Sequence, residues 1–209
     1  WRRDKLGDNT GAERDYEEAR KHDPQNEVIL RAIEQLQRNP GRERELVGTL
    51  RRLAGLDGMP SASELRREAK AIAEAQLSDA ALAEEILREM VEVDESDAWA
   101  LTELTQLRRA ASDWKEVYAL LVRRTELAAD AETIRELRHE AAEVARRELS
   151  DLASATDLHE QNFESDPRDE RASLALRELH AEAGKKKELL DLLKRLVDVA
   201  DDASKRSNL

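Results

Sequence analysis

The chain contains an internal repeat, and this repeat limits its fold more than any other feature. Residues 64–94 align without a gap with residues 136–166, an offset of 136 − 64 = 72 residues, and 13 of the 31 aligned positions are identical. Both segments contain the tripeptide Leu-Ser-Asp, at 77–79 and 149–151. A fixed period of this kind predicts an array in which each unit packs on its neighbours. The same register extends through the intervening segments, where Ile33, Leu36, Leu46 and Leu50 align with Leu104, Leu107, Val117 and Leu121, and these with Leu176, Leu179, Leu189 and Leu193.

The residue pattern inside each unit is helical. Hydrophobic residues make up 40% of the chain and recur at spacings of three and four, while aromatic residues are only 3%. This spacing is typical of amphipathic helices, and no stretch shows the alternation expected of a strand. We therefore expect an all-α fold, a right-handed α-α superhelix (solenoid) of antiparallel helix pairs of about 36 residues, two unlike pairs to each 72-residue period. The eleven expected helices are 11–22, 26–38, 42–56, 61–77, 79–93, 97–110, 113–129, 131–149, 151–165, 169–182 and 185–201.

Turn and cap residues support these divisions. Asp23-Pro24 and Asp166-Pro167 end units, because the residue before proline is disfavoured in helical conformation. Asp79, Asp113 and Asp151 precede second helices and are expected to cap them. Alanines 69, 73 and 83, repeated at 141, 145 and 155, are expected where helices approach closely. The predicted organisation is one array over 1–203, with a half-unit at 1–24 that keeps a remnant of a first helix at 1–6, pairs at 25–58, 59–95, 96–130, 131–167 and 168–203, and a frayed tail at 204–209.

One half-unit carries a recognisable motif. The run Leu6-Gly7-Asp8, Ala12, Tyr16, Ala19 and Asp23-Pro24 resembles the second half of a tetratricopeptide motif. The same places are held by Ala83, Leu87, Met90 and Asp94, and later by Ala155, His159, Asn162 and Asp166, although His159 and Asn162 replace apolar residues and the first helices lack the family's Trp-Leu-Gly-Tyr pattern.

The resemblance implies a function and a surface. Tetratricopeptide arrays are scaffolds that hold protein partners on a concave face lined by the first helix of each pair. The resemblance implies that a partner protein or peptide, acidic in character, binds at Arg31, Gln35, Arg38, Arg66, Lys70, Trp99, Thr102, Gln106, Arg109, Arg135, Arg138, Arg146 and Arg171. Arginine suits carboxylates through its planar fork of donors, and Trp99 is a candidate anchor. The alternative is that these cations pair with glutamates of the same helix, and that Trp99 and Trp114 fill gaps between helices.

Other functions receive less support. A formal net charge of −12 argues against nucleic acid as a partner, so an RNA-binding helical repeat is a minor alternative. We expect no enzyme activity, no cofactor and no metal site, since the four histidines show no ligand spacing and are expected to be solvated or partly packed. No apolar run suits membrane insertion.

The absence of cysteine fits the cytoplasm, which we favour, and the periplasm. A regulatory or substrate-docking region of a larger multidomain enzyme, and a self-associating structural role, stay open. Neither terminus carries a polar capping helix, so we expect a fragment of a longer array or ends covered by another chain.

Overall fold

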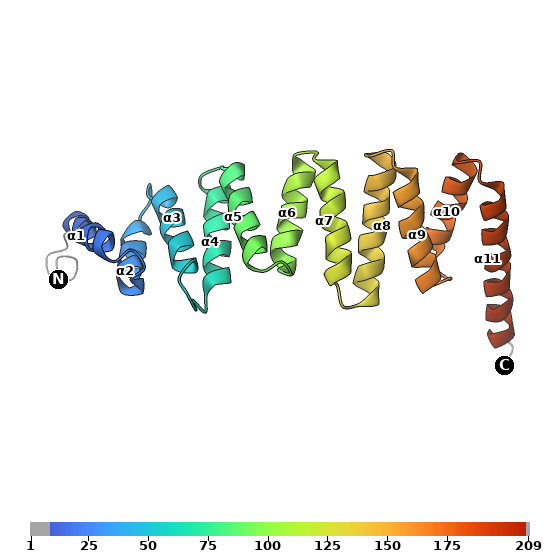
Figure 1. Ribbon diagram of the computed structural model, residues 1–209, viewed down its shortest axis with the longest axis horizontal. Helices are drawn as coiled ribbons and strands as arrows, with labels where there is room; N and C mark the ends of the chain where they lie inside the picture. Colours follow the sequence, from blue (N-terminus) through green and yellow to red (C-terminus); the bar gives the residue numbers. More distant parts are fainter. Residues whose placement is uncertain (1–8, 208–209) are drawn as a thin grey trace. The chain divides into compact units, whose positions relative to one another are not determined.

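The computed structural model describes residues 9–207, and within this range every regular element is an α-helix (Figure 1). The all-α prediction is confirmed, and the predicted helix ends agree within two residues except at the last helix. That helix continues to Ser207, so the frayed tail predicted from 204 is wrong as far as 207. The remnant helix predicted at 1–6 lies outside the described residues. The helices are α1 (Asn9–His22), α2 (Glu27–Gln37), α3 (Glu43–Ala54), α4 (Ala62–Ala75), α5 (Ala80–Val93), α6 (Ala98–Ala110), α7 (Trp114–Leu127), α8 (Ala131–Arg147), α9 (Leu152–Ser165), α10 (Glu170–Glu182) and α11 (Lys186–Ser207).

The chain forms two compact units, unit 1 (Trp1–Leu104) and unit 2 (Thr105–Leu209). In unit 1, each helix from α1 to α5 packs on the next one along the chain. In unit 2, the helices from α7 to α11 do the same (Figure 1). Packing between chain neighbours is the arrangement expected of a helical repeat. That residues 1–203 form one continuous array stays a prediction.

Small residues lie on the buried faces of the helices in both units. Ala69, Ala73 and Ala83 in unit 1 are fully buried, as are their repeat equivalents Ala141, Ala145 and Ala155 in unit 2. The prediction that these alanines lie on the packed face of their helices is therefore confirmed, and close approach of the helices at these positions stays a prediction.

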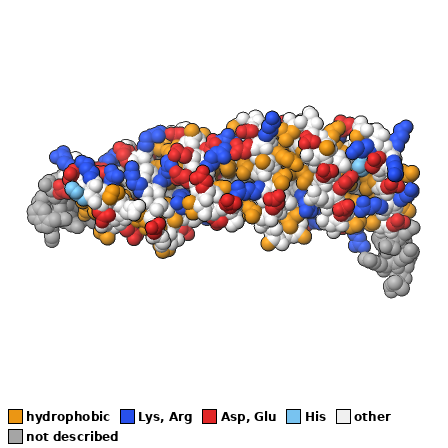
Figure 2. All heavy atoms as spheres, in the orientation of Figure 1, with side chains coloured by type: hydrophobic (Ala, Val, Ile, Leu, Met, Phe, Trp, Pro, Cys, Tyr) orange, Lys and Arg blue, Asp and Glu red, His pale blue; other side chains and the backbone are white. Residues whose placement is uncertain are grey.

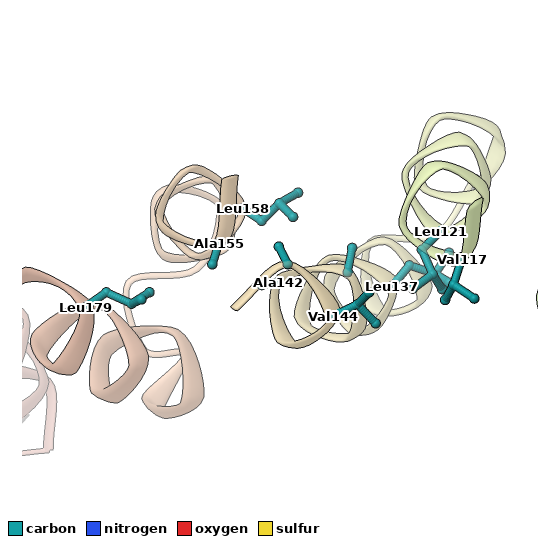
Figure 3. Packing of buried hydrophobic residues seen from close by; sticks show 10 residues of the cluster. Val117, Leu121, Leu137, Ala142, Val144, Ala155, Leu158 and Leu179 are labelled. Atoms are coloured by element: carbon teal, nitrogen blue, oxygen red, sulfur yellow. The ribbon is translucent and has the colours of Figure 1, made fainter. Parts of the chain in front are cut away.

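One aliphatic cluster shows how these helices fit together. In unit 2, Val117 and Leu121 of α7 belong to the same cluster as Leu137 of α8 and Leu158 of α9 (Figure 3). Trp114 packs against this cluster, in agreement with the gap-filling alternative. The core is thus a thin layer of Leu, Val and Ala between adjacent helices, with little aromatic content.

The turn inside each described helix pair uses a left-handed residue. Ser78, Ser112 and Ser150 have φ values of 52°, 58° and 55°, and Gly41 and Gly184 occupy the corresponding turns with φ of 88° and 68°. A non-glycine residue adopts this conformation at a cost that its surroundings must offset.

Aspartates complete three of these turns. Their side chains accept hydrogen bonds from the backbone amides of Leu82, Glu116 and Ser154, so Asp79, Asp113 and Asp151 are the N-caps that the sequence predicts. The pKa values of Asp79 and Asp151 are lowered, mainly by Arg44 for Asp79 and by the Ser154 amide for Asp151. Each cap satisfies an amide that would otherwise lack a partner, which stabilises the start of the second helix.

The close-packing assignment is testable at Ala73. Ala73→Leu places three extra carbons in a fully buried contact of α4, and we expect it to lower the free energy of unfolding by about 1–3 kcal/mol. Ala71→Leu, at an exposed position of the same helix, is the matched control and is expected to change it by less than about 0.5 kcal/mol. Urea denaturation followed by circular dichroism measures both, and equal midpoints would contradict the packing described above.

Candidate partner-binding surfaces

Most of the predicted binding cations are already paired with carboxylates. Arg38, the C-cap residue of α2, contacts Glu68 of α4 at 2.6 Å, and Lys70 of α4 contacts Glu103 of α6 at 2.6 Å. These pairs join the first helices of successive pairs, and we call them the first-helix ion pairs. Unit 2 contains equivalent contacts, Arg109–Glu140 at 2.5 Å, Arg146–Glu178 at 2.8 Å and Arg171–Glu136 at 3.3 Å. Arg31 pairs with Glu34 and Glu27 within α2, and Arg135 pairs with Glu132 and Asp166.

These contacts give the first-helix surface both signs of charge. Glu68 and Glu34 raise the pKa of Arg38 through hydrogen bonds, which keeps the guanidinium firmly charged. In each unit, basic and acidic side chains lie next to one another on the face drawn in Figure 2. An acidic partner at these positions has to compete with a carboxylate that is already in place.

Lys70 is the most buried of the paired cations. The residue is 7% exposed, and its ammonium contacts Glu74 at 2.9 Å as well as Glu103. Burial lowers the pKa of Lys70, but the hydrogen bonds to Glu103 and Glu74 outweigh burial, so the net pKa is raised. Removing one partner of a buried ion pair leaves the other charge without compensation, which lowers the free energy of unfolding.

We expect Lys70→Met to lower the free energy of unfolding by roughly 1–3 kcal/mol, because Glu103 and Glu74 lose their cation while the aliphatic stem is kept. Arg147→Met is the control, since Arg147 pairs with Glu143 at a largely exposed position and is expected to matter by at most about 0.5 kcal/mol. Chemical denaturation of both variants is the measurement. A loss for Lys70→Met no greater than for Arg147→Met would show that the first-helix ion pairs do not stabilise the fold.

The uncharged candidates on this surface have ordinary surroundings. Gln35 and Gln106 are exposed, and the Thr102 hydroxyl donates a hydrogen bond to the Ala98 carbonyl at 2.7 Å. Trp99 is half-buried, and the Arg67 guanidinium lies over its ring, 4.7 Å from the centroid. A cation–π contact of this kind holds the indole against α4.

Two of the predicted cations differ from the rest, because they line grooves. Arg66 and Arg138 are 138 − 66 = 72 residues apart and therefore occupy the same place in the repeat. Neither forms an ion pair with any described residue. Groove 1, in unit 1, has a volume of about 470 Å³ and is lined by Gly48, Arg51, Arg52, Gly55, Arg66, Glu89, Glu92 and Val93. Groove 2, in unit 2, has a volume of about 340 Å³ and is lined by Tyr118, Val122, Thr125, Glu126, Arg138, Ser154, Asp157, Leu158 and Gln161.

Groove 1 is the more basic of the two. Glu89 and Glu85 hold Arg51 and raise its pKa, whereas Arg52 and Arg66 have no carboxylate partner among the described residues. Gly48 and Gly55 lie on one face of the α3 segment and add no side chain to the groove; a Cβ at Gly48 would meet only the Arg52 guanidinium, at 3.6 Å. Val93, 68% exposed, provides an apolar contact. Groove 1 thus offers two unpaired guanidinium groups beside an apolar side chain.

Groove 2 has a mixed lining. Arg138 Nη1 lies 3.5 Å from the Ser165 hydroxyl, and its buried Nε has no partner. Glu126 and Asp157 contribute carboxylates, and Tyr118, Val122 and Leu158 contribute apolar surface. This groove is therefore less suited to an anion than groove 1.

Unit 2 also contains buried polar side chains. His139 Nε2 is 2.8 Å from Asp169 Oδ2, and the rings of His139 and His159 are 5.3 Å apart. The Asn162 amide donates a hydrogen bond to the Arg135 carbonyl at 3.0 Å. His139, His159 and His180 are all buried, so the expectation of solvated or partly packed histidines is wrong for these three.

The alignment of the repeats predicts that His159 and Asn162 are buried. Aligned at 72 residues, His159 and Asn162 match Leu87 and Met90, which are buried in unit 1. Helix packing at these positions buries the side chain in both units, and in unit 2 it removes polar groups from water.

Burial gives His159 a pH dependence. Burial, followed by the nearby charges of His139 and Arg171, lowers the pKa of His159 to about 4 from an ordinary value of 6.5. The fold binds this proton more weakly than the unfolded chain does, so the contribution of His159 to stability is complete above pH 6.5 and is lost as the pH falls towards 4. We expect His159→Gln to reduce the loss of stability between pH 7 and pH 4.5, measured by urea denaturation at both values. An unchanged difference between the two pH values would contradict the assignment.

Within residues 9–207, no group of three or more His, Asp or Glu side chains is placed to hold a metal ion. None of the described helices combines the length and the apolar character needed to cross a membrane.

Comparisons with known proteins find similar helical arrays. No protein-family model and no curated protein matches the chain. Among solved structures, the crystal structure of MamA is 16% identical with a TM-score of 0.46, over 83% of this chain and 97% of that one. The TPR-like repeats of a putative kinesin light chain from Podosopora anserina are 16% identical with a TM-score of 0.47, over 85% and 94%. BtubC from P. vanneervenii is 9% identical with a TM-score of 0.43, over 95% and 91%. The chain is similar to these proteins at identities of 16% or less and TM-scores below 0.5.

Proposed function

We propose that this chain is a non-catalytic scaffold that holds a partner protein or peptide, and that the partner places a carboxylate in groove 1. One observation carries the proposal: Arg52 and Arg66 line a groove of about 470 Å³ and have no carboxylate partner among the described residues. A guanidinium without an internal partner can form a bidentate pair with an incoming carboxylate.

The first-helix ion pairs narrow the binding surface that the resemblance implies. At Arg38, Lys70, Arg109 and Arg146, a partner has to displace a glutamate, and the exchange of one carboxylate for another yields little net free energy. At Arg66 no displacement is needed. Arg138 holds the equivalent position in groove 2, where the apolar lining favours a less charged segment of a partner.

The overall charge adds selectivity. A net charge of −12 repels acidic partners in general, so an acidic segment is held only where local cations outweigh that field. Val93 adds an apolar contact next to the cations, and this combination favours a peptide with a carboxylate beside a hydrophobic side chain.

Charge reversal tests the proposal. We expect Arg66→Glu and Arg52→Glu each to reduce partner recovery about tenfold or more, since a lost charged hydrogen bond is worth roughly 1.5–3 kcal/mol and 1.4 kcal/mol is a factor of ten. Arg147→Glu, at a largely exposed arginine of α8, is the matched control and is expected to retain binding. Affinity capture from native lysate with quantitative mass spectrometry is the measurement, and the same recovery for all three variants would refute the assignment of groove 1.

A photo-crosslinking residue locates the contact directly. Placed at Val93 in groove 1, it is expected to capture the partner that the charge-reversal variants lose; placed at Val28, which is 77% exposed on α2, it is expected not to. Equal capture from both positions would show that the partner is not held in the groove.

A further inference from the structure

The last helix carries an apolar face that the described residues leave uncovered. On α11, Leu190, Leu193 and Val197 are 54%, 40% and 59% exposed. Leu192, on another side of the helix, is buried in a cluster with Phe163 of α9 and Leu176 of α10. Three exposed aliphatic residues at spacings of three and four form a stripe along one side of a helix. We call it the α11 stripe.

The repeat shows what such a stripe packs against. Leu46 aligns with Val117 at 71 residues and Val117 with Leu189 at 72, so α3 corresponds to α11 at 71 + 72 = 143 residues. Five buried residues of α3 then correspond to the α11 stripe and its half-buried borders: Leu46, Val47, Leu50, Leu53 and Ala54 match Leu189, Leu190, Leu193, Leu196 and Val197. In α3 this face is covered, because α3 packs on α4. Equivalent positions therefore form a helix-binding face on α3, and on α11 a face that the described residues leave partly exposed.

The charges around the stripe follow the same correspondence. Arg44 of α3 contacts Asp79 at 2.7 Å, and Arg51 contacts Glu85 at 2.7 Å, so both arginines are held by the N-cap and the body of α5. Their equivalents on α11 are Lys187 and Lys194. Lys187 has no ion-pair partner among the described residues, and Lys194 has only the exposed Asp191, three residues away on its own helix.

The covering helix has a defined surface. The face of α4 that packs against its neighbours carries Leu65, Ala69 and Ala73, and in α8 the same positions are Leu137, Ala141 and Ala145. The pattern is Leu-x-x-x-Ala-x-x-x-Ala, followed in both units by a Leu-Ser-Asp turn into a second helix. Both stripes of this kind are already buried within the chain, so a second copy has none free to offer.

We propose that the α11 stripe is the docking site for a partner protein that presents a helical pair of the α4–α5 type. Its first helix places a Leu-x-x-x-Ala-x-x-x-Ala stripe on Leu190, Leu193 and Val197, and its second helix offers an acidic N-cap and glutamates to Lys187 and Lys194. This surface lies in unit 2 and is independent of groove 1.

A tethered probe tests the fit on the full chain. The probe is a second copy of residues 59–95, which contain α4 and α5, attached after Leu209 through a flexible Gly/Ser linker of about 15 residues, long enough to give an effective concentration near the millimolar range. We expect amide hydrogen exchange of residues 189–197 to slow at least tenfold relative to the chain without the probe. The matched control carries Ala69→Glu and Ala73→Glu in the appended copy alone, and is expected to show no slowing.

Two further outcomes are decisive. Leu193→Glu in the tethered chain is expected to abolish the protection of residues 189–197, while unchanged exchange in α7 to α10 shows that unit 2 of the variant is folded. Equal exchange rates with the intact and the altered probe would overturn the proposal. A concentration-dependent doubling of mass for the unmodified chain in light scattering, lost in Leu193→Glu, would also overturn it, because the occupant would then be a second copy.

Discussion

The structure depends on the burial of one thin aliphatic layer between each helix and the next. A helix such as α4 contributes Leu65, Ala69 and Ala73 to this layer, and it cannot bury them without a neighbour. Because two of the three side chains are alanine, the helix axes approach closely, and van der Waals contact replaces the aromatic bulk that the chain lacks. The layer fixes which face of each helix points inward, and thereby decides which side chains are left for solvent or for a partner.

The charged side chains that face away from this layer then form ion pairs between the first helices of successive helix pairs. Contacts such as Lys70–Glu103 connect first helices without adding to the apolar core, and they neutralise most of the cations on that surface. Arg66 escapes this pairing because it faces the groove between α3, α4 and α5. Arg66 and Lys70 lie one turn apart on the same side of α4, so the electrostatic difference between them comes from their neighbours: Glu74 and Glu103 reach Lys70, whereas no described carboxylate pairs with Arg66.

The helices were predictable because their signals are local. Apolar residues at spacings of three and four and the Asp caps are such signals, and the 72-residue register supports them by repetition; Asp79 and Ala73 hold the places that these patterns assign. The pairing of the cations was not predictable to the same degree. Glu74 is four residues from Lys70 and is visible as its neighbour, but Glu103 is reached only through the packing of α6. The burial of His159 could have been predicted from Leu87, its equivalent in the repeat, whereas the contact of His139 with Asp169 required the structure.

The cross-helix pairs also join residues that are close in sequence. Arg38 and Glu68 are 30 residues apart, and Arg51 and Glu89 are 38 apart. Contacts of such short range give a low contact order, so the entropy lost in closing each loop is small and folding is fast. A chain built in this way can fold as it leaves the ribosome, with α2 to α5 able to pack before the synthesis of unit 2 is complete.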